Sequence, residues 1–505
     1  AQCHEAQGGA RALRDSAGRD VSPSSSWRAS MMALSARDPY YLAVLEHELA
    51  AHPGAEATVM KTCTRCHAPA ANVELAAQAK TLAYADLTHG TSPDALVGRD
   101  GVTCSLCHQI QPTDLGTPAS FTGAYVIGDA RQIFGPHEAP FGMPMQMRVQ
   151  YTPIAAPHMT DSGLCGSCHT VVTRSLDAKG APEGPDVLEQ GPFVEWSVSS
   201  FAKPGGRSCQ ACHMPTVDDD GRPLSAILST MPAGNRLSPR SPFGRHLFTG
   251  ANSFMLRLLA RERAWAGVTP SADELIGQAE RAEASLRGAA ALTIVSSVRD
   301  GAALVLRARV ENLTGHKLPT AYPSRRMWLH VRVLDEAGAL AFESGAHRGG
   351  RVVDARGDVL DGRGVVVPHR GAISSASEVQ IWEAVPGDAQ GRVAPTLLDA
   401  AGFLKDDRIL PAGFDRADAR AALALPRGVD GDEDFAAGSD EVVVRVPGAP
   451  ARGRAELELL YQTTRPSELE QLAEHPGPAA RRFLDMVSPE AMAPIVMAQA
   501  SAPLP

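Results

Sequence analysis

Four copies of one short pattern, Cys-x-x-Cys-His, contain almost all of the cysteine in this 505-residue chain. The copies begin at Cys63, Cys104, Cys165 and Cys209. Together they use eight of the nine cysteines, and the ninth, Cys3, is also followed by a histidine. A cysteine directly before Ala1 would therefore complete a fifth copy. The alternative for Cys3 is a free or disulfide-linked cysteine near a terminus.

Three kinds of chemistry use cysteine pairs at this spacing. Two pairs can bind one Zn²⁺ ion, and a single pair can act as a redox-active dithiol. Neither requires histidine as the next residue, whereas covalent attachment of c-type haem does, because the two thiols bond one porphyrin edge and the adjacent imidazole binds its iron. Histidine is only 16 of 505 residues and yet follows all four pairs. We therefore expect four covalent haems c, and five if the motif at Cys3 is complete.

The pattern assigns to each haem its attachment residues and its first iron ligand. The expected attachment residues are Cys3, Cys63, Cys66, Cys104, Cys107, Cys165, Cys168, Cys209 and Cys212. The expected proximal ligands are His4, His67, His108, His169 and His213. The pattern assigns no catalytic residue.

The second axial ligand decides whether a haem only carries electrons or also binds a substrate. Six histidines outside the motifs lie within the first 250 residues, which is close to one for each expected haem. His158, seven residues before Cys165, is the first candidate. For each of these histidines, a solvated or hydrogen-bonded side chain is the alternative.

The other five candidates differ in their setting. His246 and His137 lie in loops that could reach a haem face, and His89 is a weaker candidate. His47 and His52 lie five residues apart on one predicted helix and point in different directions, so we expect only one of them to bind iron.

Several longer phrases resemble those of a known family. They are "SSWRASMMALSARDPYYLAV", "GVTCSLCHQI", "SGLCGSCHT", "RHLFTGANSFML" and "NLTGHKLPTAYPSRRMWLHV". They are similar to phrases of large bacterial multihaem c-type cytochromes related to the tetrahaem cytochromes of nitrifiers. The resemblance implies a haem-packed N-terminal domain followed by a β-sandwich, and it supports His137 and His246 as ligands. It also implies that His316, in "GHKLPT", is a distal ligand supplied by the second domain, for which a turn histidine bonded to its own loop is the alternative.

The pattern along the chain predicts an α+β fold. We expect a mostly irregular or helical multihaem domain over residues 1–265, a linking helix over 266–290, an antiparallel β-sandwich over 291–460 and a short helical tail over 461–505. Ser271, with Glu274 three residues later, should cap the linking helix. Further helices are expected within 37–52, 71–86 and 466–487, and strands at 291–298, 302–313, 326–335, 378–385, 441–448 and 454–462.

Composition excludes some classes of function. The chain is 44% hydrophobic and 21% charged, as in ordinary globular proteins. Its net charge of −9 and the lack of Lys- or Arg-rich runs give no support to nucleic-acid binding. No stretch of about 18 apolar residues predicts a transmembrane segment. No signal peptide is visible, as expected if the chain is already processed.

Two functions remain. The first is electron transfer along mostly bis-histidine haems. The redox partners would be other cytochromes or a membrane quinol-linked complex, and the chain could belong to an oligomer or a larger redox complex. The alternative is a haem oxidoreductase that acts on a small nitrogen or sulfur compound at one five-coordinate haem. The ordinary histidine in every motif favours electron transfer, so the chain is more readily an electron carrier than an enzyme. Haem attachment outside the cytoplasm predicts a periplasmic or extracellular bacterial protein.

Overall fold

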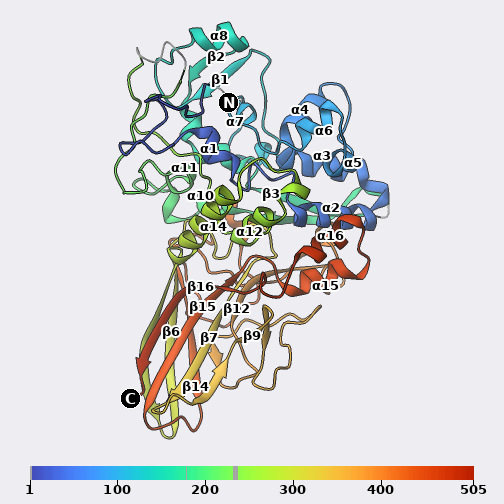
Figure 1. Ribbon diagram of the computed structural model, residues 1–505. Coiled ribbons are helices and arrows are strands. Elements are labelled where there is room, and N and C mark those ends of the chain that lie inside the picture. The colour runs from blue at the N-terminus through green and yellow to red at the C-terminus, as the bar shows by residue number, and fades with distance from the viewer. Residues whose placement is uncertain (1–2, 178, 231–236) are drawn as a thin grey trace. The chain divides into compact units, whose positions relative to one another are not determined.

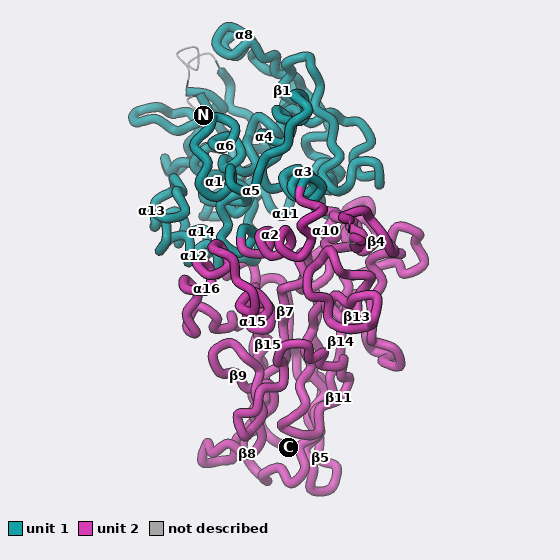
Figure 2. Tube along the Cα trace, turned by 90° about the vertical axis from the view of Figure 1, so that its right-hand side faces the viewer, with its two compact units in different colours: residues 1–42, 57–169, 207–282 teal, residues 43–56, 170–206, 283–505 magenta. Residues whose placement is uncertain are grey.

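The computed structural model describes residues 3–177, 179–230 and 237–505. They form two compact units, each assembled from segments that are separated in the sequence (Figure 2). Unit 1 consists of Ala1–Leu42, Ala57–His169 and Arg207–Ala282, and unit 2 consists of Ala43–Glu56, Thr170–Gly206 and Glu283–Pro505. All four complete motifs, as well as Cys3 and His4, belong to unit 1. The chain has the α+β fold that the sequence predicts.

Unit 2 takes two segments, Ala43–Glu56 and Thr170–Gly206, from the range that the sequence analysis places in the first domain. Compact units are defined by contacts in the folded state, and they do not show which segments fold on their own. The domain limits at residues 265, 290 and 460 therefore stay predictions.

Unit 1 is made of short helices joined by long irregular segments, with a small parallel sheet of β1 and β2 (Figure 1). Its helices are α1 (Pro23–Arg28), α3 (Glu56–His67), α4 (Pro69–Ala76), α5 (Tyr84–Thr88), α6 (Pro93–Gly98), α7 (Cys104–Cys107), η2 (Pro118–Ser120), α8 (Met143–Val149), η3 (Pro157–Thr160), α9 (Ser162–Gly166), α11 (Cys209–His213), α12 (Ser253–Arg261) and α13 (Arg263–Ala266). The two strands are β1 (Gln132–Gly135) and β2 (Thr152–Ala155). The chain changes from one unit to the other within α2 (Pro39–Ala51), α3 and α14 (Ala272–Arg287). It also does so between His169 and Thr170 and between Gly206 and Arg207.

Helix α14 begins with the capping box that the sequence predicts. The Ser271 hydroxyl accepts the backbone N–H of Glu274 at 3.2 Å, and the Glu274 carboxylate accepts the backbone N–H of Ser271 at 2.7 Å. These bonds satisfy backbone donors that a helix start otherwise leaves without partners. Glu274 also forms an ion pair with Arg28 of α1, which ties α14 to the rest of unit 1.

Unit 2 is built mainly from strands. The smaller sheet has the order β11-β14-β6-β5, and the larger has the order β13-β12-β7-β15-β16, with β8 also pairing with β7. The strands are β3 (Val171–Leu176), β4 (Pro182–Gln190), β5 (Ala290–Asp300), β6 (Ala303–Asn312), β7 (Arg326–Asp335), β8 (Leu340–Ser344), β9 (Ala346–Arg348), β10 (Arg351–Val353), β11 (Ala372–Ile373), β12 (Ile381–Gly387), β13 (Gly402–Asp406), β14 (Ser439–Val446), β15 (Gly453–Gln462) and β16 (Ile495–Pro503). The helices are η1 (Pro53–Ala55), α10 (Pro192–Ser197), η4 (Ser200–Ala202), η6 (Leu397–Asp399), η7 (Ala419–Ala424), α15 (Pro466–Glu474) and α16 (Pro478–Met486).

The six strands expected from the sequence are present as β5, β6, β7, β12, β14 and β15. Most of their ladders are antiparallel, and the short strand β11 is parallel to β14. Strand β7 pairs with β12 on one side and with β15 on the other, so that Trp328 lies opposite Ile381 and Leu460. These three side chains are at most 1% exposed and form part of one hydrophobic cluster. The expected sandwich remains an inference from this burial.

The last 45 residues are not entirely helical. Helices α15 and α16 occupy most of the expected helical region, but the chain then forms strand β16, which pairs antiparallel with β15 at the edge of the larger sheet. The sequence of β16 contains Ala, Gln and Pro, which favour strands weakly, and Pro is tolerated at an edge. Pairing with β15 therefore determines this element more than its own composition does.

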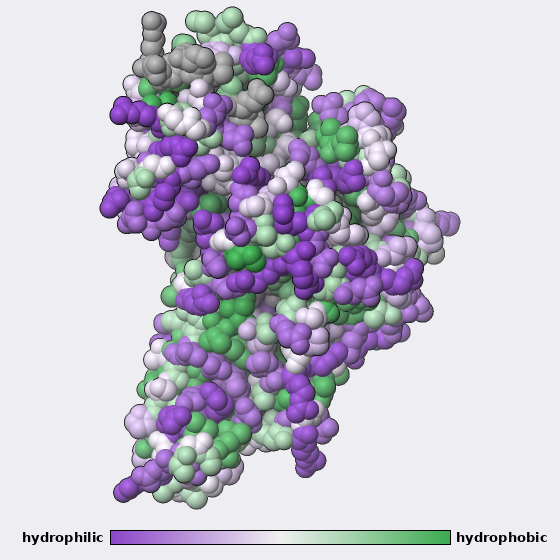
Figure 3. Space-filling view, in the orientation of Figure 1, coloured by the Kyte–Doolittle hydropathy of each residue, from purple (hydrophilic) through white to green (hydrophobic). Residues whose placement is uncertain are grey.

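The surface mixes hydrophilic and hydrophobic residues (Figure 3). Short helix α8 is one of the more apolar exposed segments, with Met143 and Met147 58% and 80% exposed. No helix among the described residues is long and apolar enough to span a membrane.

Candidate haem-attachment site

Each complete motif folds as a helical turn. Helix α3 ends with the first motif at His67, α7 contains both cysteines of the second, and α11 is the fourth motif itself. In the third motif the backbone N–H of His169 donates to the Cys165 carbonyl at 2.9 Å, which extends the turn of α9. Residues three and four apart lie on one face of a helix, so each motif presents two thiols and one imidazole to the same side. One porphyrin edge and its iron require this arrangement.

Polar residues start three of these turns, and in α9 the Asp161 carboxylate accepts the backbone N–H of Gly163 at 2.6 Å. The hydroxyl of Thr103 accepts the backbone N–H of Leu106 at 3.3 Å, and the hydroxyl of Ser208 accepts that of Ala211 at 3.2 Å. Such caps stabilise a helix by about 1 kcal/mol. Because helices α7 and α11 are only four and five residues long, they depend on caps and on surrounding contacts for their geometry.

Four of the five expected proximal histidines share one hydrogen bond. The ring Nδ1–H donates to a backbone carbonyl distant in sequence, from His4 to Leu228 (2.8 Å), His67 to Ser35 (3.1 Å), His108 to Phe134 (2.6 Å) and His213 to Thr249 (2.8 Å). A neutral imidazole has a single ring proton, so a proton on Nδ1 leaves the lone pair on Nε2. The bond also fixes the ring plane, as is usual for histidines that bind metals.

Burial favours the neutral form of these rings. It lowers the pKa of His67 and of His108 below the usual value, although the bond to the backbone carbonyl acts in the opposite direction. A histidine must be neutral at the nitrogen that binds a metal. Both side chains are therefore prepared to act as ligands at neutral pH.

Thiols from different motifs touch one another. The Cys165 thiol of the third motif lies close enough to the Cys209 thiol of the fourth to interact with it, and the Cys168 thiol of the third interacts in the same way with the Cys66 thiol of the first. Cys107 of the second motif also lies close enough to Cys168 for their charges to interact. The third motif is therefore a neighbour of the other three. All nine cysteines are free thiols in the structure.

The side chains at the motifs fit covalent haem better than zinc. Zinc held by cysteine requires three or four ligand atoms around one point. Among the described residues, no group of three or more His, Cys, Asp or Glu ligand atoms within 4.8 Å of one another includes a cysteine. Thiols and imidazole that share one helix face instead match the two vinyl groups and the iron of a single porphyrin.

Histidine 246 faces the proximal histidine of the second motif. The ring centroids of His108 and His246 are 6.2 Å apart, and their planes differ by 20°. The Nδ1–H of His246 donates to the Gly244 carbonyl at 3.1 Å, so its Nε2 carries the lone pair, as in His108. Burial lowers the pKa of His246 to about 4, which keeps the ring neutral. A metal–imidazole bond is about 2 Å long and the bonded nitrogen lies about 1 Å from its ring centroid, so two rings that share an ion have centroids about 6 Å apart.

The other spare histidines of unit 1 have different surroundings. His158, in η3, donates from Nε2 to the Ile110 carbonyl at 2.9 Å and meets the Phe134 ring edge-on, so only Nδ1 would carry its lone pair. His137 is half-buried in the loop after β1. His89 is exposed at the end of α5, and its Nδ1 hydrogen-bonds with the Thr88 hydroxyl at 2.8 Å. Their assignment as distal ligands stays a prediction.

His47, His52 and His316 belong to unit 2, whereas the motifs belong to unit 1. His52 lies beside the Thr396 hydroxyl at 3.3 Å, and His47 is half-buried on α2. The Nδ1–H of His316 donates to the Lys317 carbonyl at 3.0 Å. Their roles as iron ligands also stay predictions.

The His316 loop between β6 and β7 is held by side-chain hydrogen bonds and a buried ion pair. The Asn312 amide donates to the carbonyl of His316 at 2.7 Å and to that of Ile409 at 2.9 Å. The side chain of Lys317 is fully buried and forms an ion pair with Asp406 at 2.6 Å. The backbone at His316 therefore has little freedom to move.

Sequence reasoning missed one residue at the motifs. The ring of Tyr41 stacks on the imidazole of His67, with centroids 3.7 Å apart and planes within 4°. This contact holds the face of the imidazole while the Ser35 carbonyl holds its edge. Tyr41 lies in the phrase "DPYYLAV", but no spacing rule connects it to His67, which is 26 residues further along the chain.

Comparisons with known proteins give one structural relative. No protein-family model and no curated protein matches this sequence. The structure is similar to the crystal structure of a penta-haem cytochrome c552 from Thermochromatium tepidum, with a TM-score of 0.53 and 18% sequence identity, over 95% of this chain and 96% of that one. The chain therefore has the fold of that penta-haem cytochrome along nearly its whole length.

Proposed function

We propose that the protein is a multihaem c-type cytochrome that transfers electrons. The four complete motifs would hold four haems, and the Cys3–His4 segment would hold a fifth if a cysteine precedes Ala1. The hydrogen bond from His4 to the Leu228 carbonyl supports the fifth site, because it matches the bonds made by His67, His108 and His213. The relationship to nitrifier cytochromes remains a prediction from the quoted phrases.

The main support for this proposal is that thiols of different motifs lie close together. Cys66 meets Cys168, and Cys165 meets Cys209, so porphyrins attached at these thiols would have their edges close together. Closely spaced redox centres suit transfer from one site to the next, whereas a single catalytic centre has no need of them. When bound, the haem irons would supply the one-electron chemistry.

The protein side chains would hold each iron in a fixed environment. His108 and His246 would together hold one haem iron through their Nε2 atoms, which the 6.2 Å between their ring centroids supports. Two neutral imidazoles fixed by their Nδ1–H bonds change little when the charge on the metal changes. His158, His137, His89, His47, His52 and His316 are the remaining candidates for distal ligands. A haem without such a ligand would instead favour the alternative, an oxidoreductase for a small nitrogen or sulfur compound.

Partners and location follow from this function. Electrons would come from, and pass to, other cytochromes or a quinol-linked membrane complex. Because haem is attached to Cys-x-x-Cys-His motifs outside the cytoplasm, we place the protein in the periplasm or outside the cell.

A count of covalent haems with spin-state spectroscopy tests the proposal. Intact-mass spectrometry of the purified protein should give the mass of the chain plus four or five haems, and electron paramagnetic resonance should show mainly low-spin iron. A haem-free chain that carries zinc would refute the proposal. Predominantly high-spin iron with rapid turnover of nitrite or hydroxylamine would favour the enzyme instead.

A further inference from the structure

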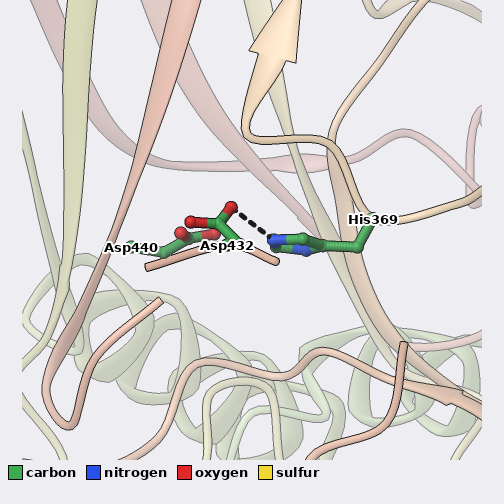
Figure 4. Close-up of side chains that lie close together, drawn as sticks. All are labelled: His369, Asp432 and Asp440. Atoms are coloured by element: carbon green, nitrogen blue, oxygen red, sulfur yellow. Dashed lines mark hydrogen bonds and ion pairs between the residues drawn. The ribbon is translucent and has the colours of Figure 1, made fainter. Parts of the chain in front are cut away.

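A histidine and three aspartates meet inside unit 2, away from the Cys-x-x-Cys-His motifs in the sequence. His369 lies in the loop before β11, Asp432 in the loop before β14, Asp440 in β14 and Asp407 directly after β13. Figure 4 shows the carboxylates of Asp432 and Asp440 next to the same ring nitrogen side of His369. One ligand atom each from His369, Asp432 and Asp440 lies within 4.8 Å of the others.

Asp440 has one carboxylate oxygen without a partner. The residue is 0% exposed, and its Oδ2 accepts the indole N–H of Trp382 at 2.6 Å. Its Oδ1 is also buried but has no hydrogen-bond donor. A buried carboxylate oxygen without a partner costs free energy, so native proteins normally give it a donor or a cation. Asp440 is the most deeply buried of the three residues that this cluster brings together.

Asp407 orients the imidazole from the other side. Its Oδ2 lies 2.9 Å from Nδ1 of His369, while Nε2 of His369 lies 3.0 Å from Oδ2 of Asp432. Asp407 is itself held by the backbone N–H of Glu383 at 2.8 Å and by the Gln380 amide at 3.0 Å. A carboxylate that accepts Nδ1–H leaves Nε2 as the ligand atom, which is the usual second shell of a metal-binding histidine.

We propose that His369, Asp432 and Asp440 bind one divalent metal ion, with Asp407 as the positioning residue for His369. Three ligand atoms each about 2 Å from one ion lie about 3 to 4 Å apart. The 3.0 Å between Nε2 of His369 and Oδ2 of Asp432 is already in that range. Small rotations of the two ligand carboxylates complete the site.

Charge balance supports a dication over a proton. The Lys405 ammonium, 3.3 Å from Asp407, compensates one of the three carboxylates. A protonated His369 would compensate a second, and the third would then have to be protonated as well. A divalent cation compensates both remaining carboxylates while His369 stays neutral.

The ligand types indicate which metal ion this is. One imidazole with two carboxylates suits Zn²⁺, whereas Mg²⁺ and Ca²⁺ prefer oxygen ligands alone. The ion would join His369 and Asp432, in two loops, to Asp440 in the smaller sheet. The hydrogen bond between His369 and Asp407 then links this site to a residue that directly follows a strand of the larger sheet. Zn²⁺ should therefore stabilise unit 2 as well as bind to it.

The test measures Zn²⁺ binding to the haem-loaded, full-length protein. After treatment with EDTA, calorimetric titration with ZnCl₂ and metal analysis should show one tight Zn²⁺ for each chain in addition to the haem iron. His369→Gln and Asp440→Asn should weaken this binding by at least about 100-fold. Asparagine at position 440 can still accept the bond from Trp382, so this variant keeps that contact.

Asp300→Asn is the matched control. Asp300 is an exposed carboxylate at the end of β5 in unit 2, 2.7 Å from Arg445, and it is not one of the three ligands. The Zn²⁺ affinity of this variant should stay within about threefold of wild type, because an exposed surface ion pair contributes little. Absence of a tight Zn²⁺ site in the wild-type protein would overturn the proposal, even if a variant fails to fold. Equal weakening by Asp300→Asn and Asp440→Asn would also overturn it. Haem spectra should be the same in all variants, so the outcome is independent of the proposed electron transfer.

Discussion

Replacing His246 with alanine tests the proposed pairing of His108 and His246 at one iron. The two ring centroids lie 6.2 Å apart and both Nδ1–H groups are bonded to backbone carbonyls, so the Nε2 atom of each ring keeps its lone pair for a metal ion. The variant should keep every covalent haem, because the thiols are unchanged. One haem should lose its sixth ligand and become high-spin.

The size of the effect follows from the number of motifs. With four haems the high-spin fraction should be about one quarter, and with five it should be about one fifth, as measured by electron paramagnetic resonance of the oxidised protein. The potential of that haem should also shift in a spectroelectrochemical titration. Added imidazole should occupy the space of the deleted ring and restore the low-spin signal.

His347→Ala provides the control. His347 is an exposed residue in β9 of unit 2 and lies against Trp328 at a centroid distance of 6.2 Å, so the change also removes one histidine ring. Its haem spectrum should equal that of the wild type. If His246→Ala leaves every haem low-spin, or if imidazole has no effect on a new high-spin signal, then His246 is not the ligand opposite His108.

Three further predictions concern stability and the second domain. Burial raises the pKa of Glu48 to about 8 from 4.5. Between these two pH values the folded protein therefore keeps a proton that the unfolded chain loses. The free energy of unfolding should fall by up to about 4 kcal/mol as pH rises from 4.5 to 8. Glu48→Gln should remove this slope in thermal unfolding series, and an unchanged slope would contradict the assignment. Ser271→Ala should destabilise the protein by about 1 kcal/mol in urea unfolding, because α14 loses its cap; no change would show that Arg28 alone anchors Glu274. His316→Ala should keep the haem count but make one haem high-spin, and an unchanged spectrum would exclude His316 as a ligand.

The sequence predicted those features that depend on local spacing. The motif turns, the capping box at Ser271 and the strand from Arg326 to Asp335 each arise from residues close together in the chain. A helix places positions i, i+3 and i+4 on one face, and a strand alternates its faces, so these patterns can be read directly. The expected helix over residues 71–86 is divided, however, because Ala79 adopts a positive φ of 55°.

Features that depend on distant contacts could not be read in this way. The backbone carbonyl groups that orient the proximal histidines belong to residues such as Ser35 and Leu228. Because every residue has a backbone carbonyl, the type of residue does not indicate which one will accept the bond. The cluster at His369 joins four loop or strand-end residues spread over more than 70 positions. No periodicity relates such positions, and only the folded topology brings them together.

The proposed haems also explain why unit 1 has so little regular structure. Helices α7, α9 and α11 are four or five residues long, far below the 12 to 15 residues at which an isolated helix becomes even marginally stable. Caps and hydrogen bonds to distant carbonyls hold these turns, and thiols of neighbouring motifs meet between them. Each attached porphyrin would add a large apolar surface bonded to two of those turn residues and to a fixed imidazole. The apolar contact that longer helices normally supply would then come from the cofactor, so short turns are sufficient as long as the haems are attached.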